Sequence, residues 1–440
     1  MARVTAWACL RSGHPTPLST LDRFADEREL DARDRALARR LVGVEIRRRG
    51  NLRALLARYQ HRKSKPDLAA HLHLGLAQLY FFERIPDHAA LSATMEAVHQ
   101  TLGPSKVRAA NGILRNALRE REEQSSGDPR RDLVGCELAV AEPVFRDPEQ
   151  HPLLWVEDAL SLPAPLAKRW QKRHGTERMH ELARQALVEP AVSVRAVGVE
   201  RSALASELES AGVLASEGAH PDVLIVPSEA TGELLQSEPF AQGRATVQGE
   251  HALRAAELVG AQKGEEVLDL CAAPGGKTAV LARSGARVVA CDVEPAKLER
   301  LHSTLERLGL AEKVELLQTE DGRDLDQDHL FDAVLVDAPC SNTGVLAARP
   351  SARWRFGPQS LASLGELQAR LLAAGAARVK PGGRLVWSTC SLEPEENEQR
   401  VRTFLTENSG WELAEEVSSL PSAAPGPVDG GYAARLVRSS

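Results

Sequence analysis

Strands and helices alternate regularly from Gln248 to the C-terminus, and this alternation constrains the fold more than any other feature of the sequence. Longer segments at a helical spacing predict helices at 278–284, 296–309 and 360–379. Shorter runs rich in β-branched residues predict strands at 266–270, 287–291, 314–318, 332–336, 384–387 and 430–437. Helices that connect consecutive strands imply a parallel sheet covered on both faces. We therefore expect an α/β domain over residues 241–440.

The first 120 residues show helical periodicity only. Apolar residues recur at a helical spacing in 36–46 and again in 72–80. Pro86, Gly103 and the Asn51 region are expected to interrupt the helices. The N-terminal part is therefore predicted to be all-α.

The residues between these two parts have a mixed character. The polar stretch 121–131 is rich in helix breakers, which predicts a linker. Further on, a predicted helix at 166–186 precedes strand-like runs at 192–199 and 223–226, with a helix at 203–210 between them. This alternation indicates a small α+β module. The sequence thus predicts a multidomain chain with three parts, at 1–135, 136–240 and 241–440.

Composition excludes several classes of protein. A chain of 440 residues is too long for one ordinary domain. No apolar run approaches the roughly 18 residues that a membrane span requires. The six cysteines are scattered without a CxxC pair, which favours a reducing cytosol and argues against a structural metal site. We therefore expect a cytoplasmic, monomeric protein that binds neither a metal nor a membrane.

Charge is distributed unevenly along the chain. The net charge is −6, yet residues 31–70 carry 12 Lys and Arg against 4 Asp and Glu. Such a local excess suits contacts with phosphates, as on an RNA-binding surface. A solvated helix face would show the same excess, so charge alone leaves both interpretations open.

A glycine turn follows the first predicted strand of the α/β domain. Gly275 and Gly276 lie where that strand passes into a helix, so the backbone can approach a ligand without a Cβ in the way. The spacing fits neither a dinucleotide-binding GxGxxG motif nor a P-loop. Acidic residues follow the next three strands, at Asp292, Asp321 and Asp337. Asp292 is the candidate for the hydroxyls of a ribose and Asp321 for an adenine amino group, although each alone could be a turn residue or a helix cap.

Two cysteines follow the fourth and fifth predicted strands. Cys340 and Cys390 are therefore expected at the same edge of the sheet as the acids. Methylation of carbon 5 of a pyrimidine requires a nucleophile to add to carbon 6 first, and a thiolate is suited to that addition. A second cysteine can help to remove the carbon-5 proton. Cys271 and Cys291 are interpreted instead as buried small hydrophobes.

The motifs around these residues resemble those of the NOP/Sun family of RNA 5-methylcytosine methyltransferases. The similar segments are DLCAAPGGKT (269–278), DAPCSNTG (337–344) and STCSLEPEENE (388–398). The resemblance implies a Rossmann-like fold that binds S-adenosylmethionine, an attacking thiolate at Cys390 and a thiol at Cys340 that promotes product release. Asp337 would also hydrogen-bond the cytosine edge. The implied catalytic residues are Cys390, Cys340, Asp337 and Lys277. The implied cofactor-binding residues are Cys271, Ala272, Ala273, Pro274, Gly275, Gly276, Lys277, Asp292, Asp321 and Asp337.

The N-terminal helices resemble a NusB-type RNA-binding domain in the segments 34–42, 74–90 and 111–119. A NusB-like domain joined to this catalytic module is the layout of family members that modify a cytosine in 16S ribosomal RNA. The resemblance therefore implies ribosomal RNA as the partner, with transfer RNA as the main alternative. A NusB-like RNA-binding or assembly factor with a decayed methyltransferase module is the alternative without catalysis. A nicotinamide oxidoreductase is disfavoured because the GxGxxG motif is absent.

The chain departs from the family pattern at three places. Gly249 stands where relatives usually carry an acid, Asn342 stands where they usually carry a glycine, and 194–197 reads VRAV in place of LRVN. These departures leave the thiols and the three acids in place, so they are expected to affect RNA positioning. Arg349 and Arg353 fit the basic segment that follows the first thiol motif in relatives.

Overall fold

The computed structural model describes residues 1–322, 325–326, 328–422 and 428–440, and the chain forms two compact units. Unit 1 contains Met1–Val188 and Arg349–Gly357, and unit 2 contains Glu189–Ala348 and Pro358–Ser440. The division between the units falls at neither of the boundaries predicted near 135 and 240. The three-part organisation therefore stays a prediction. In the structure, residues 136–188 belong to the same compact unit as the N-terminal helices.

Unit 1 is built from helices, as the periodicity of its first 120 residues predicts. α3 begins after an N-cap, Asp31, whose carboxylate accepts from the backbone N–H of Asp34 at 2.7 Å. α3 is kinked at Arg48, whose φ of −106° and ψ of 15° are not helical, so the interruption predicted in the Asn51 region lies three residues earlier. Asn51 itself is buried in α3, and its amide donates to the carbonyls of Asp158 and Ala159. The helices are α1 (Ala2–Arg11), α2 (Leu21–Asp26), α3 (Ala32–Tyr59), α4 (Pro66–Phe81), α5 (Asp87–Leu102), α6 (Pro104–Arg119), α7 (Pro152–Ala159), α8 (Ala164–His174), α9 (Thr176–Gln185) and α16 (Ala352–Arg355).

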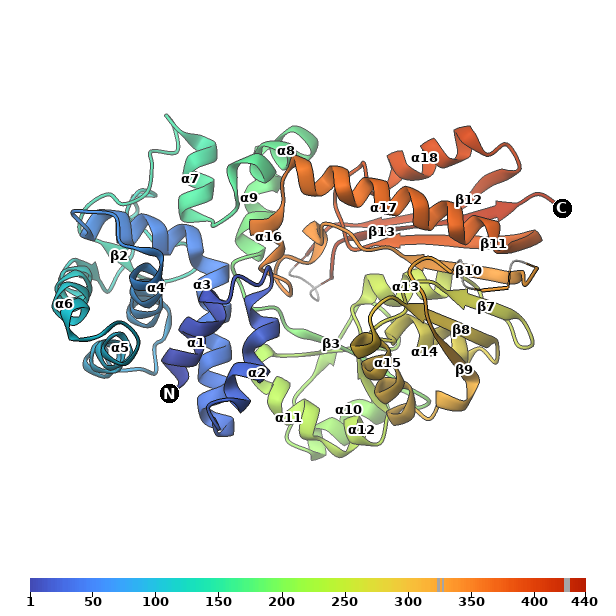
Figure 1. Cartoon of the computed structure of the whole chain (residues 1–440), viewed down its shortest axis with the longest axis horizontal. Helices are drawn as coiled ribbons and strands as arrows, with labels where there is room; N and C mark the ends of the chain where they lie inside the picture. The colour runs from blue at the N-terminus through green and yellow to red at the C-terminus, as the bar shows by residue number, and fades with distance from the viewer. Residues whose placement is uncertain (323–324, 327, 423–427) are drawn as a thin grey trace. The chain divides into compact units, whose positions relative to one another are not determined.

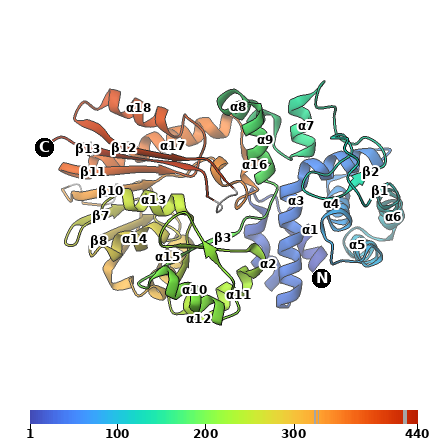
Figure 2. The ribbon, with the colours of Figure 1, turned by 180° about the vertical axis from the view of Figure 1, so that it is seen from behind.

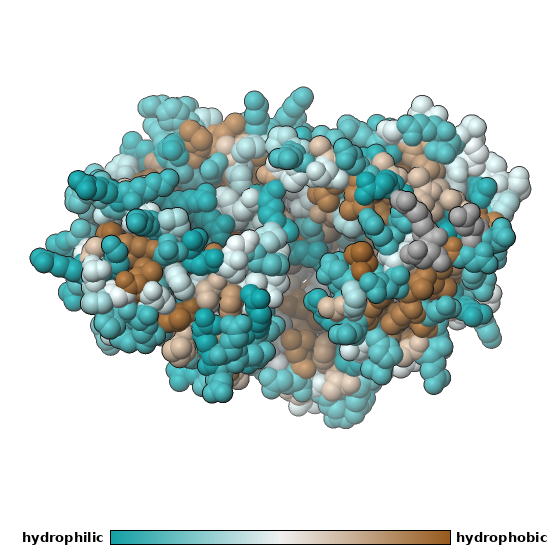
Figure 3. Space-filling model, viewed as in Figure 1, coloured by the Kyte–Doolittle hydropathy of each residue, from teal (hydrophilic) through white to brown (hydrophobic). Residues whose placement is uncertain are grey.

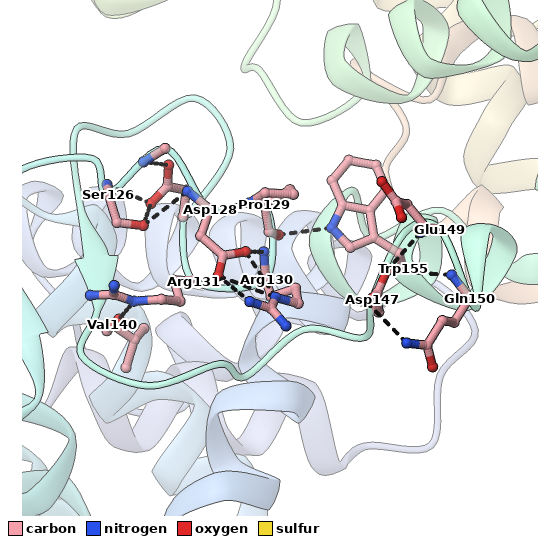
Figure 4. A network of polar contacts seen from close by, with 12 residues as sticks. Ser126, Asp128, Pro129, Arg130, Arg131, Val140, Asp147, Glu149, Gln150 and Trp155 are labelled. Atoms are coloured by element: carbon pink, nitrogen blue, oxygen red, sulfur yellow. Dashed lines mark hydrogen bonds and ion pairs between the residues drawn. The ribbon is translucent and has the colours of Figure 1, made fainter.

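Two predictions between 121 and 186 are corrected by the structure. The single helix predicted at 166–186 is two helices, α8 and α9, which are separated by Gly175 with φ of +83°. The stretch predicted as a linker packs within unit 1 (Figure 4). The Trp155 indole donates to the carbonyl of Pro129 at 2.8 Å, and the Arg131 guanidinium donates to that of Val140 at 2.8 Å. Its polar residues therefore bond within unit 1 rather than only to solvent.

The first part of unit 2 is a small antiparallel sheet with helices beside it (Figure 2). Its strands are β3 (Val192–Ala196), β4 (Ser216–Glu217), β5 (Val223–Val226) and β6 (Ala245–Val247), in the order β4-β5-β3-β6. Its helices are α10 (Arg201–Ser210), α11 (Thr231–Gln236) and α12 (Glu238–Ala241). The predicted α+β module thus has its two strands and the helix between them. β4 and β6 are not predicted from the sequence, because runs of two and three residues are too short to show the alternation of a strand.

The second part of unit 2 is a seven-stranded sheet. Its strands are β7 (Glu266–Asp269), β8 (Arg287–Asp292), β9 (Val314–Gln318), β10 (Phe331–Asp337), β11 (Val379–Thr389), β12 (Trp411–Ser419) and β13 (Gly431–Arg438), in the order β12-β13-β11-β10-β7-β8-β9. The five neighbouring strands β11, β10, β7, β8 and β9 pair in parallel, as predicted. The prediction of a wholly parallel sheet is wrong at one side, where β13 and β12 pair antiparallel. β12 escapes prediction because most of its side chains are exposed.

Helices cover both faces of this sheet (Figure 1). One face carries α13 (Glu250–Leu258), α14 (Gly276–Arg283) and α15 (Pro295–Arg307), and the other carries α17 (Pro358–Ala377) and α18 (Glu398–Glu407). Leu301 and Leu305 of α15 belong to one buried cluster, whereas Leu371 and Leu372 of α17 belong to another. Because β10 and β11 are neighbours that run in parallel, their carboxyl ends meet at one edge of the sheet.

In the described part of the chain, no helix is both long enough and apolar enough to cross a membrane. The face seen in Figure 3 is mainly hydrophilic, and its apolar side chains gather in small separate patches.

Candidate active site

The two predicted thiols lie at the carboxyl ends of neighbouring strands. Asp337 of β10 pairs with Ser388 of β11, and the chain continues from each strand into a loop that carries a cysteine. The sulfur atoms of Cys340 and Cys390 are 3.3 Å apart. Cys340 is buried, whereas Cys390 is half-buried and therefore the more accessible of the two. The fold thus brings together two cysteines that are 50 residues apart in the sequence.

Lys277 and Asp337 form a charged pair next to the thiols. Nζ of Lys277 is 2.7 Å from Oδ2 of Asp337, and the other carboxylate oxygen accepts from the Ser388 hydroxyl at 3.0 Å. Burial alone would lower the pKa of Lys277, but the Asp337 carboxylate outweighs burial and the pKa is raised. The Lys277 ammonium also interacts electrostatically with Cys390. A positive charge held beside a thiol favours the thiolate, which supports Cys390 as the nucleophile.

The Cys340 thiol has a different environment. Its contact with the Cys390 sulfur and then its burial raise the pKa of Cys340 well above the usual range of a thiol. The nearby Glu396 carboxylate acts in the same direction. Cys340 therefore keeps its proton more firmly than an ordinary thiol, which suits an auxiliary role better than nucleophilic attack.

Glu396 ties the two cysteine loops together. Its buried carboxylate accepts from the hydroxyls of Ser341 and Ser391, the residues that directly follow Cys340 and Cys390. The backbone N–H of Ser341 and the side-chain amide of Gln368 each donate to it at 2.9 Å. These donors satisfy a charge whose burial would otherwise be costly. Residue spacing gives no sign of this bracing role, because the partners come from three separate segments.

The glycine turn between β7 and α14 lies at the same edge of the sheet. Gly275 has φ of +105°, and a Cβ there would lie 2.5 Å from the Leu301 side chain, so conformation and space both favour glycine. At the end of β8, Asp292 is buried and accepts from the backbone N–H groups of Val293 at 2.8 Å and Ala273 at 3.4 Å. The carboxylate of Asp292 therefore lies against the glycine-rich segment.

These residues fit the binding of S-adenosylmethionine. The turn leaves room for close approach of a ligand, and Asp292 offers acceptors to ribose hydroxyls. Val293 follows Asp292 and is 48% exposed, an apolar surface suited to an adenine face. Sequence reasoning missed Val293, although an apolar residue after a strand-end acid could have indicated it. Asp321 follows β9, the neighbour of β8, and is also buried.

Cys291 of β8 and Cys271, which follows β7, differ in burial. Cys291 is fully buried, and burial raises its pKa to about 12. Burial also raises the pKa of Cys271, which packs against the apolar cluster beneath α17. The interpretation as a buried small hydrophobe agrees with the packing of Cys291, whereas Cys271 is only half-buried.

The environment of Asp269 predicts that the free energy of unfolding depends on pH. Its carboxyl group is fully buried, accepts from the Thr278 hydroxyl at 2.8 Å and has its pKa raised to about 7, mainly by burial. A raised pKa stabilises the fold most below pH 4, where the group is also protonated when unfolded, and this stabilisation is lost as the pH rises through 7. Relative to Asp269→Asn, the wild type should lose on the order of 2–4 kcal/mol between pH 4 and pH 8. The same dependence of the unfolding free energy on pH in both proteins would contradict this prediction.

The basic stretch 31–70 is only partly on the surface. Arg47 and Arg48 are buried, and Arg49 pairs with the buried Glu45 at 2.7 Å. The interpretation as a phosphate-binding surface therefore applies to the exposed members alone. These are Arg33, Arg39, Arg40, Arg53, Arg58, Arg62, Lys63 and Lys65.

Arg353 also lies inside unit 1 rather than on a basic surface. Its side chain is fully buried, and its guanidinium donates to the carbonyls of Ala186 at 2.6 Å, Ser161 at 3.3 Å and Arg47 at 3.5 Å. Burial, with repulsion from neighbouring arginines, lowers the pKa of Arg353 to about 9. The indole of Trp354 donates to the carbonyl of Ile46 at 2.7 Å. The segment therefore completes the interior of the helical unit.

Comparisons with known proteins agree with this fold and site. The family model described as 16S rRNA methyltransferase RsmB/F matches residues 256–426, and the NusB family model matches residues 16–119. Ribosomal RNA small subunit methyltransferase B of Salmonella heidelberg (strain SL476) is 32% identical over 379 residues, which cover 83% of this chain and 81% of the relative.

Solved structures show the same fold. The crystal structure of PH0851 superposes with a TM-score of 0.78 at 21% identity and covers 99% of this chain and 98% of that one. NSun6 from Pyrococcus horikoshii, solved with SFG, gives a TM-score of 0.55 at 19% identity, over 63% of this chain and 98% of that one.

Fold, motifs and matches together define an RNA methyltransferase that uses S-adenosylmethionine. The chain belongs to the RsmB/F family, and its N-terminal helices form a NusB domain.

Proposed function

We propose that this chain methylates carbon 5 of a cytosine in 16S ribosomal RNA through a covalent adduct with Cys390. The observation that carries the proposal is the pair of sulfur atoms 3.3 Å apart beside the Lys277–Asp337 ion pair. Pyrimidine carbon 5 needs prior attack at carbon 6, and this edge of the sheet offers a half-buried thiol for that attack. The NusB domain and the names of the curated relatives support ribosomal RNA as the substrate.

The side chains divide the reaction between them. When bound against Gly275, Asp292 and Asp321, S-adenosylmethionine supplies an electrophilic methyl group. The target base leaves its stack, and Asp337 and Lys277 hold its polar edge. The Cys390 thiolate adds to carbon 6, which makes carbon 5 nucleophilic. Carbon 5 would then take the methyl group, and the electron pair of the broken bond would stay on the cofactor sulfur as S-adenosylhomocysteine leaves. Once Cys390 is bonded to carbon 6, its sulfur no longer raises the pKa of Cys340, so Cys340 can act as the base that takes the carbon-5 proton. The double bond then re-forms and the Cys390 sulfur departs as a thiolate.

The direct test is methyl transfer in vitro. Purified protein, labelled S-adenosylmethionine and either 16S ribosomal RNA or transfer RNA are incubated, and bisulfite sequencing locates the modified cytosine. We expect label and 5-methylcytosine in 16S ribosomal RNA. Label in transfer RNA alone would instead support the transfer RNA alternative. Cofactor binding without methylation of either RNA would support a binding factor that has lost catalysis.

Asp292→Ala should weaken cofactor binding without unfolding the protein. Loss of the ribose acceptors is expected to cost about 1–3 kcal/mol, or about 5- to 150-fold in affinity. Calorimetric titration with S-adenosylmethionine measures the effect. Glu306→Ala on α15 serves as the control, because Glu306 is an exposed acid on the same unit. Equal affinities of the two variants, both with melting curves like the wild type, would refute the role of Asp292.

A further inference from the structure

Asn342 has a contact that a glycine at this position could not make. Sγ of Cys390 donates to its side-chain Oδ1 at 3.2 Å. Its Nδ2 donates to the carbonyl of Cys340 at 2.6 Å. The residue has φ of +58°, a left-handed conformation that glycine adopts freely and that Asn tolerates better than most residues. The backbone would therefore accept glycine equally well, and it is the side chain that contacts the candidate nucleophile.

The two bonds together determine which atom faces the sulfur. The amide nitrogen is committed to the Cys340 carbonyl, which can only accept, so the amide oxygen faces Cys390. An amide oxygen cannot donate, and a hydrogen bond to it requires the proton to be on the sulfur. A thiolate would place its charge against the negative end of the carbonyl dipole. Asn342 thus favours the neutral thiol of Cys390 in the resting site.

The other groups around Cys390 act in both directions. The Lys277 ammonium favours the thiolate. Asp337, paired with Lys277 at 2.7 Å, offsets part of that charge, and the Cys340 sulfur at 3.3 Å competes for the same proton. Glu396 carries a further negative charge close to Cys340. Asn342 is therefore one member of a balance, and its removal should shift that balance toward the thiolate.

We propose that Asn342 is a positioning residue that holds Cys390 protonated and in one orientation until a substrate base enters the site. The inference deepens the proposed function, because it rests on Cys390 being the nucleophile. It assigns to this chain a restraint on the thiol that a glycine at the same position would not provide.

The test compares the wild type with Asn342→Gly, a substitution that the left-handed backbone accepts without strain. The full-length proteins are treated with iodoacetamide between pH 6 and pH 10, and peptide mass spectrometry follows each cysteine. Near pH 7 we expect Cys390 to react about 3- to 10-fold faster in the variant, because loss of the amide oxygen weakens the hold of the sulfur on its proton and raises the thiolate fraction by that factor. The difference should shrink at high pH, where both proteins present the thiolate.

Cys136 in the same digests is the internal control, because it is half-buried and belongs to unit 1, whereas Asn342 belongs to unit 2. Equal Cys390 rates in the two proteins, or a rise of the same size at Cys136, would overturn the inference. Because alkylation needs no RNA, its outcome is separate from the proposed function. If the variant behaves as expected while the wild type transfers no methyl group to RNA, the proposed function fails and the restraint on the thiol stands.

Discussion

Cys390→Ala should abolish methyl transfer and leave no covalent complex with RNA. The variant lacks the sulfur that adds to carbon 6, and without this addition carbon 5 does not attack the methyl group. Loss of an attacking nucleophile typically reduces the rate by several orders of magnitude. Incubation with methyl-labelled S-adenosylmethionine and RNA, followed by denaturing electrophoresis, should show neither labelled RNA nor a retarded protein band.

Cys340→Ala should give the opposite species. Attack by Cys390 and methylation of carbon 5 do not require the Cys340 thiol, but removal of the carbon-5 proton does in the proposed mechanism. The reaction should therefore stall as a protein–RNA complex that survives denaturation and carries the label. Adduct in Cys390→Ala instead would exchange the two roles. Absence of adduct from both variants would contradict the covalent mechanism.

Melting curves of both cysteine variants are the necessary control. The sulfur atoms are in contact at 3.3 Å, so each substitution removes one partner of a packed pair. A structural cysteine would lose stability on substitution and trap no adduct. Cys291→Ala provides a matched comparison, because Cys291 is a fully buried cysteine of the same sheet with no assigned chemistry. It should lower the melting temperature and leave the adduct pattern of the wild type unchanged.

Arg353→Ala should be the most destabilising single substitution considered for unit 1. The guanidinium donates to the carbonyls of Pro350, Arg47, Ser161 and Ala186, and the side chain is fully buried. Alanine would remove this donor from four carbonyls inside the unit, and each lost buried hydrogen bond costs about 1–3 kcal/mol. We expect a total loss of about 3 kcal/mol or more, measured as a drop in the unfolding transition by calorimetry.

Arg39→Ala is the control for this substitution. Arg39 also belongs to unit 1, but its ion pair with Asp22, at 3.0 Å, joins two exposed side chains. Exposed pairs contribute about 0–1 kcal/mol, so the control should melt close to the wild type. Similar losses for Arg39→Ala and Arg353→Ala would show that the buried carbonyls do not depend on the guanidinium.

Much of the sheet could be predicted because three of its central strands, β7, β8 and β10, contain short buried apolar runs. β7, β8, β9 and β10 all lie within a residue or two of their predicted bounds. Strand-end residues such as Asp337 and Asp292 could be placed at one edge because the parallel order dictates where strands end. β12 could not be predicted, since an exposed strand at the side of a sheet lacks the apolar alternation on which prediction depends.

Contacts between distant segments account for the remaining differences. Asn51 is typical of a turn, and α3 is kinked three residues before it, but carbonyls more than 100 residues away accept from its amide and hold it inside the helix. Arg353 has the composition of a phosphate-binding residue, yet carbonyls from three other segments surround it. Glu396 likewise has no local signature of its role. Charged residues are expected at the surface by default, and only the folded structure shows which of them are buried.

The nine residues Arg349–Gly357 limit how the helical unit can be exchanged between related genes. They belong to the helical unit although they are encoded between two stretches of the catalytic unit. A gene fragment that ended at Val188 would therefore encode carbonyls whose buried donor, Arg353, is missing. Because the guanidinium donates to main-chain carbonyls of Ser161 and Ala186, an exchange of the helical unit between relatives depends on the arginine and not on which residues supply the carbonyls. We expect a hybrid joined at 188 to keep a stable helical unit only when its segment 349–357 still carries that arginine.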